Sequence, residues 1–137
     1  MRKPLIALIP FLTACAGEPP TNIGIVDGQL TACPDSPNCV SSYTDTSDEE
    51  HSIAAIDATL DQIEAVLVSL DEANIVEAGS DYIYAEFTSR IMGYVDDVEF
   101  LLDNTNGMIQ VRSASRLGHS DLGANRKRIE AIRNAIQ

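Results

Sequence analysis

Residues 82–102, YIYAEFTSRIMGYVDDVEFLL, contain the pattern that decides the fold. Polar and apolar side chains alternate on both sides of Gly93, and such alternation is typical of β-strands with one buried face. We therefore predict strands over residues 82–90 and 95–102, joined by a turn. One face of these strands carries Ile83, Ala85, Phe87, Ser89, Asp96, Val98, Phe100 and Leu102. A single carboxylate, that of Asp96, thus lies among side chains that point toward the core.

Two further segments extend the pattern to four strands. Residues 74–78 form a short strand candidate, and residues 108–116 follow Asn106-Gly107, a dipeptide typical of hairpin turns. If Phe100 pairs with Val111, the last two strands bring Asp96 opposite Ser115 and Glu99 opposite Arg112. On the outer face of the sheet we expect weak, exposed cross-strand ion pairs among Glu86, Glu99, Arg90 and Arg112.

Helical patterns flank the strands. Over residues 53–72 apolar residues recur at three- and four-residue steps, which predicts an amphipathic helix; they are Ile53, Ile56, Leu60, Ile63, Leu67 and Leu70. Ser52, directly before this range, can cap the helix. The last segment is also predicted to be a helix, with Ser120 or Asp121 as its cap. Its apolar stripe consists of Leu122, Ile129, Ile132 and Ile136, and Asn125 falls on the same stripe. The predicted fold is α+β: a four-stranded antiparallel meander with two helices on one face, in the order helix, four strands, helix.

A group of polar residues is expected near one end of this sheet. A buried carboxylate needs hydrogen-bond donors, because burial without them is costly. Candidates that could surround Asp96 lie in the last strand and just after it, and the predicted cluster is Asp96, Ser113, Ser115, Arg116, His119, Asn125 and Arg126. We favour an internal network that fastens the last helix to the sheet. A pocket for a small anionic or polar ligand is the second interpretation, since arginine suits carboxylate and phosphate groups.

The first fifteen residues predict export. Arg2 and Lys3 precede the short apolar run 5–11, and Leu12-Thr13-Ala14-Cys15 resembles the lipobox of bacterial lipoprotein precursors. The run is too short to span a bilayer, so residues 1–14 are predicted to be a lipoprotein signal peptide. The resemblance implies a diacylglycerol and an acyl chain such as palmitate on Cys15. Ala16, in place of a sorting aspartate, favours the outer membrane, with the protein facing the periplasm.

The segment after the signal has a loop-like composition. Residues 15–32 are rich in Pro and Gly without a periodic apolar face, so we expect a flexible tether, followed by a single domain over 33–137. Cys33 and Cys39 favour a structural disulfide in an oxidising compartment. A metal site or a redox pair are the alternatives, although zinc usually needs four ligands and redox pairs favour Cys-x-x-Cys. No cofactor motif is present, and no metal site is expected.

The charge balance excludes some partners. The chain has nine basic residues, and removal of Arg2 and Lys3 with the signal leaves seven against twenty-one acidic residues. Such an acidic protein is not expected to bind nucleic acid, nor to be held on anionic lipid by charge alone.

Several runs of the chain resemble domain-of-unknown-function family 1499, which occurs in bacterial envelopes and plastids. The resemblance covers about residues 30–137 and is strongest over 37–42, 85–90, 94–100 and 111–126. It implies a domain without an assigned activity. We therefore expect a membrane-anchored envelope lipoprotein whose non-catalytic domain binds an envelope protein or a small anionic ligand, or has a structural role. The alternative is a small hydrolase-like enzyme that uses Asp96, Arg116 and His119, although no nucleophile elbow is present.

Overall fold

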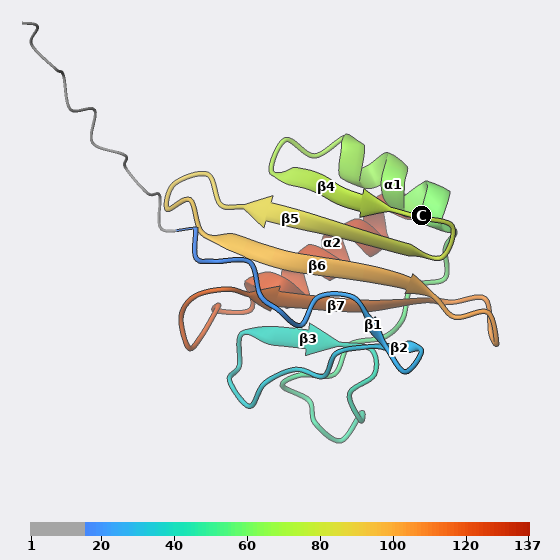
Figure 1. The fold of residues 1–137 in the computed structure, drawn as a ribbon, viewed down its shortest axis with the longest axis horizontal. Coiled ribbons are helices and arrows are strands. Elements are labelled where there is room, and N and C mark those ends of the chain that lie inside the picture. The colour runs from blue at the N-terminus through green and yellow to red at the C-terminus, as the bar shows by residue number, and fades with distance from the viewer. Residues whose placement is uncertain (1–15) are drawn as a thin grey trace, which may run out of the picture.

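The computed structural model describes residues 16–137, so the predicted signal peptide and Cys15 lie outside the described residues. The main sheet has five strands in the order β3-β7-β6-β5-β4, and each neighbouring pair is antiparallel (Figure 1). Their bounds are β3 (Cys39–Ser41), β4 (Ala73–Ala78), β5 (Tyr82–Thr88), β6 (Val95–Leu102) and β7 (Ile109–Ser115). The helices are α1 (Leu60–Val68) and α2 (Ala124–Ile136), and a separate two-stranded sheet consists of β1 (Ile25–Val26) and β2 (Gln29–Leu30).

The α+β class and the antiparallel sheet are confirmed, but the sheet has five strands where the sequence predicts four. The predicted strands correspond to β4–β7, with Phe100 opposite Val111, Asp96 opposite Ser115 and Glu99 opposite Arg112. The additional strand β3 pairs with β7 along the sheet edge. Its three residues are all buried and too few to display an alternating pattern.

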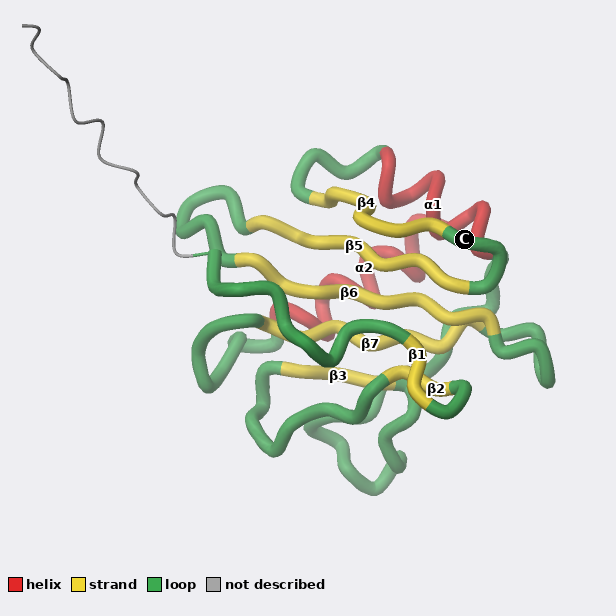
Figure 2. Tube along the Cα trace, viewed as in Figure 1, coloured by secondary structure: helices red, strands yellow, loops and turns green. Residues whose placement is uncertain are grey.

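Both helices cover one face of the sheet and enclose the main core (Figures 1 and 2). The fully buried side chains of this core include Ile63 and Leu67 from α1, Ile129 and Ile132 from α2, and Phe100 from β6. Neither described helix is long and apolar enough to cross a membrane. The core forms as predicted, because the apolar stripes of both helices face the apolar side of the meander.

The first helix is shorter than the predicted range of 53–72. It begins after Thr59, whose hydroxyl oxygen accepts a hydrogen bond from the Gln62 amide at 3.2 Å, while the Gln62 side chain accepts one from the Thr59 amide. Ser52 is therefore not the cap. Ile56 is buried in an extended segment instead, where its amide and carbonyl both pair with Ile109 at 2.8 Å. The buried Ile53 and Ile56 match helical spacing without being helical.

The last helix also begins later than predicted, after the first residue of the predicted apolar stripe, Leu122. Leu122 is 87% exposed and has a positive φ of 54°, so it is not part of the core. The N-cap position is Gly123, in the left-handed conformation that glycine adopts readily. The carboxylate of Asp121 accepts hydrogen bonds from the amides of Gly123 and Asn125 at 2.8 and 2.9 Å. Asp121 thus satisfies free amides at the helix start, as a capping residue does.

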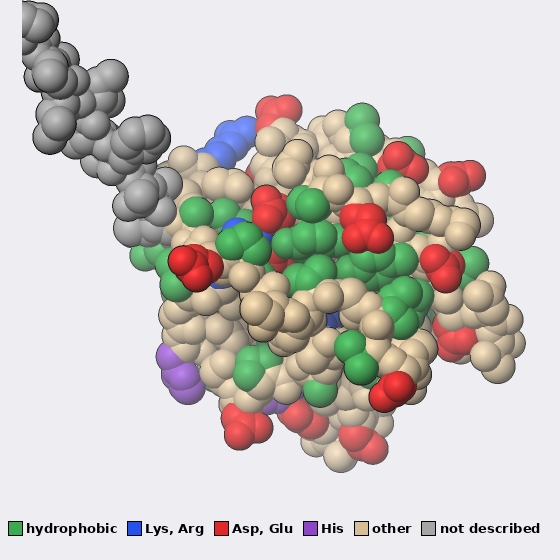
Figure 3. Space-filling view, viewed as in Figure 1, with side chains coloured by type: hydrophobic (Ala, Val, Ile, Leu, Met, Phe, Trp, Pro, Cys, Tyr) green, Lys and Arg blue, Asp and Glu red, His purple; other side chains and the backbone are tan. Residues whose placement is uncertain are grey.

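Residues 16–30, the major part of the predicted tether, have defined structure in contact with the outer face of the sheet (Figure 2). Leu30 packs against Tyr82, Tyr84 and Leu101, and the Gly24 amide donates a hydrogen bond to Glu99 Oε1 at 2.7 Å. Figure 3 shows this face, with hydrophobic side chains across its middle and acidic ones around them. The large apolar side chains of the outer face are stabilised when they are removed from water, and residues 16–30 cover them although this segment has no periodic apolar pattern.

The Glu99–Arg112 pair lies under this cover and is not the exposed pair expected from sequence. Arg112 Nη1 lies 3.3 Å from Glu99 Oε2, and the two side chains are 3% and 0% exposed. The Tyr82 hydroxyl also donates to Glu99 at 2.8 Å, and burial together with this carboxylate raises the pKa of Tyr82. Loss of one partner of such a pair leaves a buried charge uncompensated.

The predicted disulfide is present. Cys33 and Cys39 are joined by an S–S bond of 2.05 Å. The bond connects the segment after β2 to the first residue of β3, so it ties the N-terminal cover to the sheet edge.

Replacement of Glu99 by Ala tests the buried pair. We expect the free energy of unfolding to fall by about 3–5 kcal/mol, because Arg112 stays buried without its counter-charge. Urea denaturation measures the change. Glu64→Ala, an exposed site on α1, is the control and should change stability by about 0.5 kcal/mol or less. Equal stability of the two variants would show that the pair is not needed.

Candidate functional site

The sheet divides the predicted polar cluster into separate parts. Asp96, Ser113, Ser115 and Asn125 meet on the helix-covered side. Arg116 lies on the other side, since successive strand residues point to opposite faces.

Two further members of the predicted cluster lie elsewhere. His119 is exposed in the loop after β7 and makes no side-chain hydrogen bond to any residue in the range 16–137. Arg126 donates to the backbone carbonyls of Glu49, Glu50 and Ser52. It therefore connects α2 to the loop before Ile53. It makes no hydrogen bond to Asp96, whose partner is Arg128.

Asn125 is the centre of the part that does form. It is fully buried, and its Nδ2 donates to the Asn38 carbonyl, Ser115 Oγ and Asp121 Oδ2 at 3.0, 2.9 and 2.8 Å. Its Oδ1 accepts from Ser113 Oγ at 2.6 Å. Burial alone would raise the pKa of Asp121, but the hydrogen bonds from Asn125 and Gly123 outweigh it and hold that pKa below its usual value.

Arg128 completes this network and was missed by the sequence analysis. Its Nη2 lies 2.5 Å from Asp96 Oδ2, and its Nη1 donates to Ser113 Oγ and Asn125 Oδ1 at 3.1 and 2.8 Å. The guanidinium also lies over the Phe87 ring, 4.8 Å from its centre. Its position three residues after Asn125 was the available signal, because such residues share a helix face. The network agrees with the favoured interpretation, a fastening of the last helix to the sheet.

Arg116 belongs to a second network, on the outer face. Its Nε and Nη2 donate to the two carboxylate oxygens of Asp97 at 2.9 and 2.7 Å, and Nη2 also pairs with Glu86. The Tyr84 hydroxyl donates to Asp97 at 2.6 Å. Burial and the hydrogen bond to Asp97 raise the pKa of Tyr84, and the hydrogen bond to Asp97 is the main cause that raises the pKa of Arg116.

The enzyme alternative required Asp96, Arg116 and His119 in one place. Arg116 is bonded on the opposite face of the sheet from Asp96, and His119 is exposed. The structure therefore does not join these three residues in one hydrogen-bonded site. Within residues 16–137, no group of three or more His, Cys, Asp or Glu side chains is arranged to hold a metal ion.

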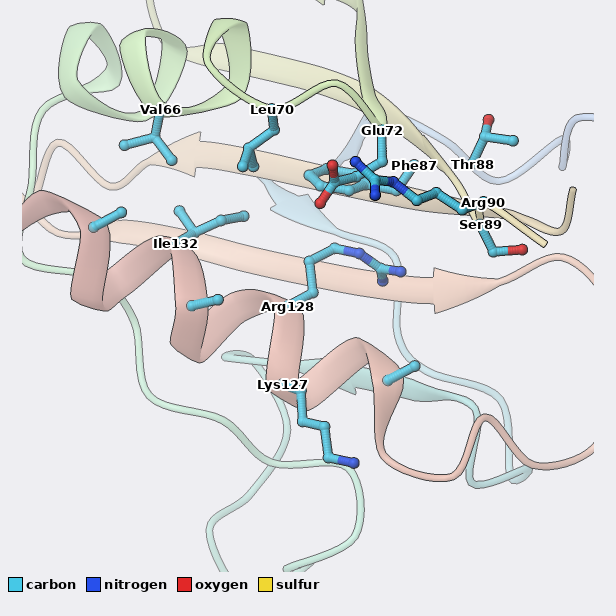
Figure 4. Close-up of a pocket in the computed structure, with 13 residues that line it drawn as sticks. Val66, Leu70, Glu72, Phe87, Thr88, Ser89, Arg90, Lys127, Arg128 and Ile132 are labelled. Atoms are coloured by element: carbon cyan, nitrogen blue, oxygen red, sulfur yellow. The ribbon is translucent and has the colours of Figure 1, made fainter. Parts of the chain in front are cut away.

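A groove of about 580 Å³ lies beside Arg128, between α1, α2 and the end of β5 (Figure 4). Its walls are mostly apolar and include Val66, Leu70, Phe87, Ala131, Ile132 and Ala135. One end carries polar and charged side chains, namely Glu72, Thr88, Ser89, Arg90, Lys127 and Arg128. Small side chains at positions 131 and 135 leave space between the helices, which sequence patterns did not predict.

The groove contains the cations that the fold leaves free. Five of the seven basic residues in the described chain make side-chain hydrogen bonds. Arg90 and Lys127 make neither side-chain hydrogen bonds nor ion pairs within residues 16–137, and both line the groove. Glu72 also lines it, but within these residues it forms no ion pair with either cation. In so acidic a chain, the groove concentrates the positive charge that is available to a ligand.

The architecture defines a small two-layer α+β domain with an antiparallel sheet. A family model described as "Protein of unknown function (DUF1499)" matches residues 29–136, so the chain belongs to this family, as its motifs predicted. Neither the curated proteins nor the solved structures gave a match. The family identifies the domain, and the site must supply the argument for function.

Replacement of Asp96 by Ala tests the inner network. We expect a loss of about 2–4 kcal/mol in the free energy of unfolding, because the largely buried guanidinium of Arg128, 16% exposed, loses its counter-charge beside the buried Ser113 and Asn125. The exposed Asp57→Ala serves as the control in the same urea denaturation. Arg128→Ala should cost less in the Asp96→Ala background than in wild type. Additive losses would show that the two side chains do not act together.

Proposed function

We propose that this chain is a lipid-anchored protein of the bacterial cell envelope whose domain binds a small amphiphilic anion without catalysis. The observation that carries the proposal is the groove, which combines apolar walls with two unpaired cations, Arg90 and Lys127. Its size is in the range of small-molecule sites, which are commonly about 300–1,000 Å³. A ligand with an alkyl part and an anionic head matches both ends of such a groove.

Each part of the ligand has a counterpart in the groove. The alkyl part would pack on Val66 and Leu70, which are partly exposed and gain by leaving water, next to the buried Ile132. The anionic head would meet Arg90 and Lys127, whose charge no protein carboxylate within 4 Å neutralises in residues 16–137. The lining has the hydroxyls of Thr88 and Ser89 but no His or Cys, which supports binding rather than nucleophilic catalysis.

Anchoring is proposed from the sequence. The basic and apolar start and the lipobox-like residues 12–15 support acylation of Cys15 after removal of residues 1–14. The Cys33–Cys39 disulfide supports an oxidising compartment such as the periplasm. By the same resemblance, Ala16 favours the outer membrane. The membrane is thus the first partner, and a small anionic ligand is the second.

Ligand binding can be measured by calorimetry with dodecanoate, and with dodecanol as the uncharged probe. We expect dodecanoate to bind the mature protein more tightly, and Arg90→Gln or Lys127→Gln to weaken it about tenfold each, or about 1.4 kcal/mol. Affinity for dodecanol should change little. Glu72→Gln, which removes a negative charge from the same groove, should strengthen dodecanoate binding.

Two outcomes would contradict the binding proposal. One is an affinity for dodecanoate that none of the three substitutions alters. The other is unchanged binding in Ala135→Phe, since a phenyl ring at this wall position should fill the apolar part of the groove. Circular dichroism of each variant would check that the fold is retained.

Cys15→Ala tests the anchor. Without the thiol that accepts the lipid, the protein should move from the membrane fraction to the soluble fraction of the envelope, and acyl labelling should disappear. Ala16→Asp is the matched control, because it keeps Cys15: the lipoprotein resemblance implies retained acylation with a shift toward the inner membrane. Continued acyl labelling of the Cys15→Ala protein would refute the assignment.

A further inference from the structure

Exposed apolar side chains gather at one end of the sheet, in the loops β5–β6 and β7–α2. Ile91 is 93% exposed and Leu122 is 87% exposed, and Met92, Tyr94 and Leu117 are exposed as well. The two loops leave the same end of the sheet, because β5 ends where β6 begins and β6 begins where β7 ends. Figure 1 shows both loops at that end, with the N-terminal segment between them.

The N-terminal chain arrives at the same end. Gly17 lies against Arg116 and Leu117: a side-chain carbon at Gly17 would be 3.2 Å from Arg116 Cβ and Leu117 Cγ. Ala16 is joined to Cys15 by one peptide bond, and consecutive Cα atoms are about 3.8 Å apart. The described chain therefore begins beside Leu117 of the β7–α2 loop, and the residue proposed to carry the lipid precedes it by one peptide bond.

We propose that this end of the domain docks on the bilayer that holds the anchor, with the exposed apolar side chains of the two loops in the lipid interface. The inference rests on the proposed acylation of Cys15. Ile91 and Leu122 would reach the boundary between headgroups and acyl chains, where apolar side chains of peripheral proteins insert. Tyr94 is suited to the same depth, since its ring is apolar and its hydroxyl polar.

The two loops carry little negative charge. Residues 89–94 contain Arg90 and no carboxylate, and residues 116–123 contain only Asp121, which is engaged with the start of α2. Acidic side chains are dense elsewhere, for example in residues 45–50. Glu18, Asp71 and Glu72 also lie at this end of the sheet, so the low negative charge is a property of the two loops that would meet the lipid and not of the whole end.

A bilayer fits the position better than a second protein does. A lipid on Cys15 keeps the membrane within a few residues of the loops at all times, which gives it a high effective concentration. Stable attachment also benefits from a second contact beyond a lipid anchor. Since residues 16–30 lie against the sheet and are not a free tether, the anchor and the loops would approach the bilayer together.

The chain contains no tryptophan, so one introduced residue reports its own surroundings. The test uses purified, lipidated Leu122→Trp protein in phosphatidylcholine vesicles with brominated acyl chains, which quench tryptophan near the hydrocarbon. Val26→Trp is the control. Val26 is 61% exposed in β1 and pairs with Gln29 of β2, and the next residue of β2, Leu30, packs near the opposite end of the sheet on Tyr82 and Leu101.

We expect strong quenching and a blue-shifted emission for Leu122→Trp, and neither for Val26→Trp. Flotation of the vesicles reports anchoring separately. Co-flotation without quenching of Leu122→Trp would overturn the docking proposal and leave the anchor intact, whereas failure to float would overturn both. A blue shift already present without vesicles would also overturn docking, because it would identify a protein contact at these loops.

Discussion

Strand β6 carries carboxylates to both faces of the sheet, and the rest of the structure is arranged around their neutralisation. Asp96 points to the helix side, whereas Asp97 and Glu99 point to the outer side. A buried carboxylate needs donors or a counter-charge. Arg128 of α2 supplies these on the inner side, and Arg116 and Arg112 supply them on the outer side, where the N-terminal segment adds a backbone amide to Glu99. One strand thus fastens the layers on both faces.

This arrangement divides the basic residues of the domain between structure and ligand. Five of the seven in the described chain are engaged with carboxylates, carbonyls or hydroxyls of the fold. Arg90 and Lys127 are free, and both line the groove between the helices. Arg128 links the two roles, because it pairs with Asp96 and also forms part of the groove wall. The cationic end of the groove lies near the apolar loops, so the proposed anchor would bring it close to the bilayer.

The alternation along the strands was sufficient to predict four strands and which residues share a face. It did not fix the register: the opposition of Phe100 and Val111, which the structure shows, entered the sequence analysis only as a condition, because a shift of two residues keeps the same face buried. Periodicity gave the wrong start for the first helix, because an extended segment can by chance have apolar residues at helical spacing: Ile53 has this spacing but lies before the helix. The polar cluster was only partly correct, because strand parity separates Arg116 from Asp96. Arg128 was not found, since its contact depends on how α2 is rotated over the sheet. The cover formed by residues 16–30 has no periodic pattern from which it could be predicted.

The central claim, that the carboxylates of β6 fasten the two faces separately, is tested most directly by native-state hydrogen exchange. Asp96→Asn and Glu99→Gln keep the shape of each side chain and remove its charge. The account predicts faster exchange at the α2 amides, including Ile129, in Asp96→Asn alone, and faster exchange at Gly24 and its neighbours in Glu99→Gln alone. A uniform increase over the whole chain in both variants, or no local increase in either, would contradict it.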